Sequence, residues 1–136
     1  MGLGGNSQFI GRNSPLDDYQ VNRYLLNKFF MSKKNNLIVD LSFQFSLDII
    51  CFTESLESLK KWNLARQLFK SGTSVGANIR ESQGAESKDD FIHKLKIAYK
   101  EAEETEYWLN LCAAVESYPN PGKLSDDIVS ILKSLN

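Results

Sequence analysis

Proline is nearly absent from this chain, and its placement constrains the fold more than any motif does. The only prolines are Pro15, Pro119 and Pro121, so nothing between the first two forces a helix to break. Apolar residues in that span recur at helical spacing, and strand-like alternation does not persist. One apolar stripe follows the offsets i, i+4, i+7 and i+11: Phe45, Ile49, Phe52 and Leu56. The chain is therefore predicted to be all-α.

The same periodicity predicts five helical segments, at residues 16–34, 40–59, 61–83, 88–117 and 125–135. The first is a short amphipathic helix, and the break before the last falls at the YPNPG sequence of residues 118–122. Four main helices joined by short loops predict an antiparallel up-down four-helix bundle with a short extra N-terminal helical segment. Residues 1–15 are expected to form a flexible leader, and residues 16–136 a single four-helix-bundle domain.

Composition excludes several classes of function. The net charge of −1 provides no global field that would draw the chain to nucleic acid or anionic lipid. No apolar run approaches the roughly 18 residues needed to span a bilayer, and the N-terminus lacks the features of a signal peptide. Cys51 and Cys112 lack CxxC spacing, which indicates buried thiols in a reducing compartment, with a disulfide between them as the alternative. We expect a cytoplasmic protein without membrane contact.

The glycine-rich stretch SGTSVGANIRESQGA, residues 71–85, could be a phosphate-binding loop or part of a helix. It lacks the GxxxxGK[ST] pattern of a Walker A loop and the strand-plus-GxGxxG pattern of a dinucleotide site. On a helix, Gly72 and Gly76 continue the apolar face. Each glycine costs about 0.8–1.0 kcal/mol relative to alanine, and close approach of another backbone would offset that cost. The neighbour could belong to the same chain or to another subunit.

The opposite side of this helix carries three bases, Arg66, Lys70 and Arg80. A solvated helix back is the simpler interpretation, because charges on helices usually face water. The alternative is a basic stripe that follows the phosphates of RNA or DNA, reinforced where several subunits present it side by side.

The long helix at 88–117 places Glu106 within its apolar sector. A buried carboxylate is costly unless it is hydrogen-bonded. We therefore expect Glu106 to accept hydrogen bonds from Asn78, or from groups near it such as Ser71, in a polar network that fixes helix register. Trp108 lies off the apolar sector and is the best candidate for a subunit contact.

Catalytic chemistry finds little support in the sequence. The single histidine, His93, lies away from the core, and the ExxH motif of carboxylate-bridged metal bundles does not occur. Neither cysteine nor any serine has a histidine at a recognisable spacing. We predict no catalytic residue, no metal site and no cofactor.

Three blocks in order, SGTSVGANIRES, DDFIHKLKIA and EAEETEYWL, carry a resemblance. They resemble the signature of small bacterial four-helix-bundle proteins, some of them encoded in intervening sequences of the 23S ribosomal RNA. The likeness covers residues 36–135. It implies a left-handed antiparallel bundle that assembles into a ring, commonly a homopentamer. A similar accessory protein of diversity-generating retroelements implies a basic surface that binds nucleic acid and a reverse transcriptase.

Two functional hypotheses follow. The first is a non-enzymatic, ring-forming scaffold or adaptor, in which Gly72, Gly76 and Trp108 serve close helix packing within or between subunits. The second is an accessory protein that binds RNA or DNA through Arg66, Lys70 and Arg80.

Overall fold

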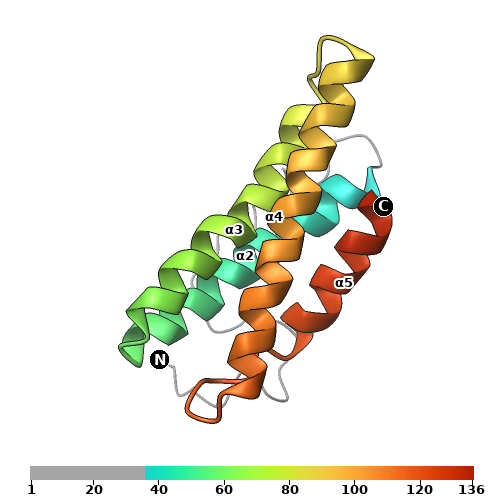
Figure 1. The fold of residues 1–136 in the computed structure, drawn as a ribbon. Helices are drawn as coiled ribbons and strands as arrows, with labels where there is room; N and C mark the ends of the chain where they lie inside the picture. Colours follow the sequence, from blue (N-terminus) through green and yellow to red (C-terminus); the bar gives the residue numbers. More distant parts are fainter. Residues whose placement is uncertain (1–35) are drawn as a thin grey trace.

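The computed structural model describes residues 36–136, which form four α-helices (Figure 1). In chain order these are α2 (Leu37–Ser58), α3 (Trp62–Ser82), α4 (Lys88–Ala114) and α5 (Lys123–Leu135). The described part of the chain contains no strand, so the prediction of an all-α fold is confirmed. The predicted leader at 1–15 and the predicted helix at 16–34 lie outside the described residues.

The helices form an antiparallel up-down bundle, as predicted. α3 packs against α2 and α4, and α5 closes the bundle by packing against α4 and α2. Successive helices run in opposite directions, so the start of α3 and the end of α4 lie at the same end of the bundle (Figure 1). Because α5 has 13 residues and α4 has 27, the hairpin of α3 and α4 extends beyond the end of α5 (Figure 1).

One continuous core holds the bundle together. The apolar stripe predicted on α2 is fully buried at all four of its positions, and it packs with small and branched residues of the other three helices. Burial of these side chains supplies most of the stabilisation of the four helices, since isolated helices are marginal in water. The fully buried members on the other helices are Leu68, Val75, Ile79, Ala98, Ala102, Leu109, Ile128 and Ile131.

Local signals explain where the helices begin and end. Ser87 caps α4, because its hydroxyl accepts from the backbone N–H of Asp90 at 3.0 Å, and such a cap satisfies an otherwise unpaired donor. Gly122 precedes α5 with a φ of 55°, a backbone conformation that favours glycine. Two boundaries differ from the predictions by three residues: α2 begins at Leu37 instead of Asp40, and α4 ends at Ala114 instead of residue 117. The other helix ends lie within two residues of the predicted positions. None of the helices in residues 37–135 is long and apolar enough to cross a membrane.

Candidate functional site on α3 and α4

The two glycines of α3 pack against α2 of the same chain. A Cβ atom added at Gly72 would lie 2.9 Å from Cγ1 of Ile49. One added at Gly76 would lie 3.0 Å from the Ser46 hydroxyl and 3.1 Å from the backbone carbonyl oxygen of Ser42. Both distances are shorter than ordinary van der Waals contact. The neighbour that the sequence left open is therefore α2 of the same chain.

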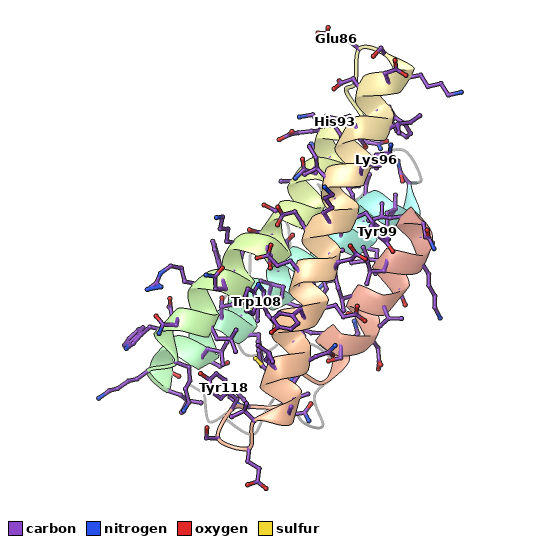
Figure 2. All side chains as sticks on the ribbon, in the orientation of Figure 1. Glu86, His93, Lys96, Tyr99, Trp108 and Tyr118 are labelled. Carbon is purple, nitrogen blue, oxygen red and sulfur yellow. The ribbon has the colours of Figure 1, made fainter. Side chains whose placement is uncertain are left out.

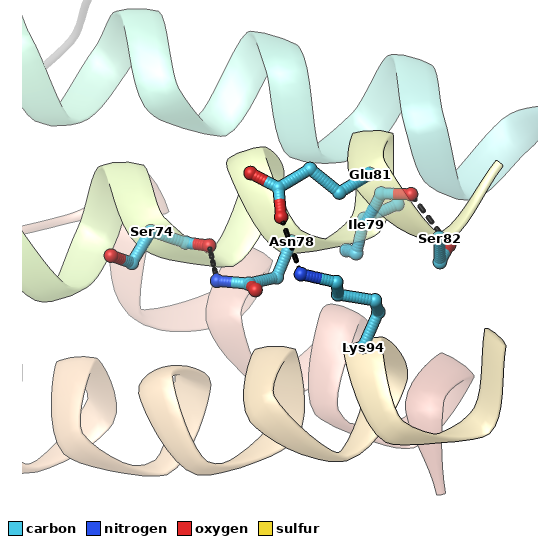
Figure 3. Close-up of polar contacts among 6 residues, drawn as sticks. All are labelled: Ser74, Asn78, Ile79, Glu81, Ser82 and Lys94. Carbon is cyan, nitrogen blue, oxygen red and sulfur yellow. Dashed lines mark hydrogen bonds and ion pairs between the residues drawn. The ribbon is translucent and has the colours of Figure 1, made fainter. Parts of the chain in front are cut away.

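The polar contact between α3 and α4 differs from the predicted one. Asn78 donates its amide N–H to the carbonyl oxygen of Ser74, on its own helix, at 2.9 Å (Figure 3). Glu106 is only half-buried, and no hydrogen bond joins it to Asn78 among the described residues. The expected buried pair of Asn78 and Glu106 was wrong, because the long glutamate side chain extends toward the solvent instead of remaining in the core.

Thr105, one residue earlier on α4, makes the buried polar contact instead. Its hydroxyl lies 2.7 Å from the carbonyl oxygen of Glu101 and 2.9 Å from the hydroxyl of Ser71 on α3. The carbonyl can only accept, so the Thr105 hydroxyl serves it as donor and shares a second hydrogen bond with Ser71. Ser71 was the right position on α3. Thr105 was missed because a threonine at a core position of a helix gives no charge signal.

The exposed side of α3 combines bases with aromatic rings. Arg66, Lys70 and Arg80 are exposed, as the hypothesis of a basic stripe requires. Trp62 is 54% exposed and Phe69 is 46% exposed, and both follow the spacing of the same outer face. No aspartate or glutamate occurs between Glu57 and Glu81 in the sequence. The bases within that interval are Lys60, Lys61, Arg66, Lys70 and Arg80.

The C-terminal half of α4 has the opposite charge on its exposed side, whereas the lysines of this helix all lie before residue 101. From residue 101 to residue 122 the sequence contains no lysine or arginine. Tyr107 is 57% exposed and lies edge-to-face against Trp108, with ring centroids 5.2 Å apart. Tyr107 was not singled out from the sequence, although a tyrosine at an outward helix position between glutamates is the signal that would have found it. The acids of this interval are Glu101, Glu103, Glu104, Glu106 and Glu116.

Trp108 is held within its own chain. Its indole N–H donates to the Glu104 carboxylate at 3.1 Å, and its ring is half-buried against the core. It lies toward the C-terminal end of α4 (Figure 2). The contact of Trp108 with another subunit stays a prediction, and the more exposed ring of the aromatic pair belongs to Tyr107.

Charges on the two helices also interact within the chain. Lys94 of α4 donates to the Glu81 carboxylate of α3 at 2.9 Å (Figure 3), and this hydrogen bond raises the pKa of Lys94. Burial raises the pKa of Glu101, with a further contribution from Glu104, while Lys70 on α3 acts in the opposite direction. Charges of opposite sign therefore also interact across the seam between α3 and α4 within one chain.

Two residues considered for chemistry occupy unremarkable positions. Burial raises the pKa of the Cys112 thiol to about 11, so it stays protonated near neutral pH and is a poor nucleophile. His93 is exposed on the part of α4 that extends beyond α5 (Figure 2). Within the described residues, no three histidine, cysteine, aspartate or glutamate side chains are grouped so that they could hold a metal ion.

The fold and these sequence blocks can now be compared with known proteins. The family model described as "23S rRNA-intervening sequence protein" matches residues 34–136. The chain belongs to this family. The match spans the whole described bundle and agrees with the extent of the resemblance seen in the sequence.

A solved structure supports the assignment to the 23S rRNA-intervening sequence protein family. It is a protein from Bacteroides thetaiotaomicron, described as having unknown function and as coming from the S23 ribosomal protein family. The two chains are 40% identical with a TM-score of 0.68, and the similarity covers 72% of this chain and 94% of that one. Among curated proteins, none matched this chain.

Proposed function

We propose that this protein is a self-assembling, non-enzymatic helical scaffold or adaptor whose copies form a ring, a homopentamer by analogy with the resemblance seen in the sequence. The carrying observation is the exposure of aromatic rings on outward faces of α3 and α4. Trp62, Phe69 and Tyr107 are each about half exposed. Large apolar side chains that remain in water on a folded domain mark contact surfaces more often than chance, and tryptophan and tyrosine are enriched at such surfaces.

Within one chain Tyr107 packs edge-to-face against Trp108, but all three rings remain about half exposed. The core is filled without them, since Phe45, Phe52 and Leu109 are fully buried. Covering the exposed rings with a second copy would remove apolar area from water at about 25 cal/mol per Å². That gain in free energy supports self-association as the role of the outward faces of α3 and α4.

Light scattering coupled to size-exclusion chromatography tests the proposal on the full chain. We expect a mass several times that of the 15.4 kDa chain, and a pentamer would give about five times it. A particle of one chain at micromolar concentration would contradict the proposal.

A second candidate function, the binding of RNA or DNA, is favoured by the acid-free interval of α3. Single-strand binding sites usually combine lysine or arginine side chains, which follow the phosphate backbone, with aromatic rings on which nucleobases stack. Arg66 and Lys70 would contact phosphates, and Arg80 would extend the stripe along the helix. Fluorescence anisotropy with a labelled single-stranded RNA at low salt tests this. We expect binding that weakens steeply as salt rises, and no binding by the wild-type chain would contradict it.

A matched pair of variants localises that binding. The double reversal R66E/K70E is expected to abolish it, while K88E/K133E, with the same change in net charge at other exposed bases, should retain most of it. Equal losses in both variants would indicate a non-specific charge effect and would reject the stripe.

A further inference from the structure

Charge is segregated between α3 up to Arg80 and the part of α4 from Glu101 onward. The interval from residue 58 to residue 80 contains five bases and no acid, and the interval from 101 to 122 contains five acids and no base. We call the first surface the basic face (Lys60, Lys61, Trp62, Arg66, Phe69 and Lys70) and the second the acidic face (Glu103, Glu104, Tyr107 and Asn110). All the residues of both faces except the half-buried Lys61 are exposed.

Both faces lie at the same end of the bundle. α3 begins where α4 ends (Figure 1), so Trp62 lies near the level at which α4 terminates. The hydroxyl contact between Ser71 and Thr105 fixes this register at 2.9 Å. Phe69 lies two residues before Ser71 on α3, and Tyr107 lies two residues after Thr105 on the antiparallel α4. The two rings therefore lie at about the same height along the hairpin. Each face therefore carries a half-exposed aromatic ring among charges of one sign.

From this arrangement we infer that the basic face of one copy docks on the acidic face of the next copy. The inference rests on the proposed self-assembly and names the surfaces that make it. Opposite potentials across a contact give it specificity, while like charges facing each other cost several kcal/mol. A contact centred on either face alone would bring like charges together. Pairing the basic face with the acidic face avoids that repulsion and buries the rings of Trp62, Phe69 and Tyr107.

Such a contact uses two different patches of each copy. When the same step repeats with a rotation that closes, it generates a ring. Each copy then has both of its faces occupied, and no unpaired face remains at an edge. The nucleic-acid alternative uses the basic face and leaves the acidic face without a role, so a second copy accounts for more of the surface.

The acids that end α2 limit where the basic face can extend. Glu54 and Glu57 are exposed at the end of α2, just before the acid-free interval. The docking partner must therefore contact the α3 side of this corner, around Arg66 and Phe69. Lys70 also lies close enough to Glu101 of its own chain to favour the charged form of that carboxyl.

Charge reversal and its compensation test the pairing in the full chain, with sedimentation velocity as the measurement. R66E/K70E places acids opposite acids, and E103K/E104K places bases opposite bases. Each variant is expected to raise the dissociation constant at least about tenfold. The combined variant R66E/K70E/E103K/E104K restores opposite charges in exchanged places and should assemble again to the mass of the wild type. K88E/K133E is the control and should assemble normally.

The outcomes separate this inference from the proposed function. A wild-type monomer would contradict both. A wild-type oligomer that tolerates both double reversals would overturn the pairing and leave self-assembly intact. Reversals that dissociate the oligomer without rescue in the combined variant would also overturn it, because the two faces would then not contact each other. Circular dichroism of each variant establishes that the bundle remains folded, so that a loss of assembly reports on the contact.

Discussion

Replacement of Gly72 by alanine sets two effects of similar size against each other. Alanine is favoured over glycine in a helix by about 0.8–1.0 kcal/mol, so an open position would gain that amount. At this position the new Cβ would lie 2.9 Å from Cγ1 and 3.0 Å from Cγ2 of Ile49. Ile49 is fully buried and β-branched, so it cannot rotate away. Overpacking of this kind costs about 1–3 kcal/mol. We expect G72A to lower the free energy of unfolding by about 1 kcal/mol net.

A double-mutant cycle with Ile49→Ala makes this reasoning refutable. I49A alone should cost about 2–5 kcal/mol, because it leaves a cavity in the core. In that background the atoms that crowd Gly72 are gone, so G72A should raise stability by about 1 kcal/mol. The predicted change of sign corresponds to a coupling of about 2 kcal/mol, within the range seen for contacting residues.

Urea unfolding followed by circular dichroism measures all four corners of the cycle. One fixed protein concentration is used, because any association of copies would add to the apparent stability. Gly84→Ala is the control, since the nearest atom to its new Cβ is 4.0 Å away, and it should change stability little. If G72A stabilised the wild-type protein as much as it stabilises I49A, the close approach of α2 and α3 would not exist as described.

Three further predictions concern single side chains. Thr105→Val should lower the free energy of unfolding by about 1–3 kcal/mol, because it leaves the buried Ser71 hydroxyl without its partner. The double variant S71A/T105V should lose clearly less stability. Urea unfolding compares the two variants, and equal losses would refute the pairing of Ser71 with Thr105. Ser87→Ala removes the cap of α4 and should lower the free energy of unfolding by about 1 kcal/mol. S134A, at an exposed serine in the last turn of α5, is expected to change it little in the same assay. The raised pKa of Cys112, about 11, means that the thiol ionises at lower pH in the unfolded chain than in the folded one. Its contribution to stability is therefore present below pH 9 and lost as the pH rises toward 11. C112A should flatten the dependence of stability on pH over that interval, and an unchanged dependence would show that burial of the thiol does not matter.

Much of the fold could be predicted from the sequence, because helical periodicity and the scarcity of proline are local signals. The stripe from Phe45 to Leu56 identified the buried side of α2 correctly, and Gly72 and Gly76 indicated a close approach. Which helix approaches could not be predicted, since pairing between helices depends on contacts between residues distant in the sequence. The helix ends were less certain: α2 begins at the exposed Leu37, after Asn36, whose side chain makes no capping hydrogen bond, so no capping signal marks this end.

The error at Glu106 shows why angular position on a helix cannot by itself identify a buried polar group. Glu106 and Thr105 are adjacent on α4, and the carboxylate was the more conspicuous. A glutamate has enough length to reach solvent from the edge of an apolar sector, while a threonine hydroxyl stays close to the backbone and must find its partner inside. Ser71 supplies that partner at 2.9 Å. The short polar side chain is thus the one that reports on helix register.

Net charge was a poor guide to function for a related reason. A value of −1 excludes a global field, yet it conceals local runs of one sign: residues 58–80 contain bases and no acid, and residues 101–122 contain acids and no base. Fields near a surface depend on charges within about 8–10 Å at physiological salt, so a partner at α3 meets Lys70 and Arg66, and one at α4 meets Glu103 and Glu104. Two oppositely charged surfaces on one chain would complement each other in the proposed contact between copies. A chain with only one of these surfaces would need a different partner. The combined variant R66E/K70E/E103K/E104K, which exchanges the charges of both faces, is therefore a more decisive experiment than the reversal of either face alone.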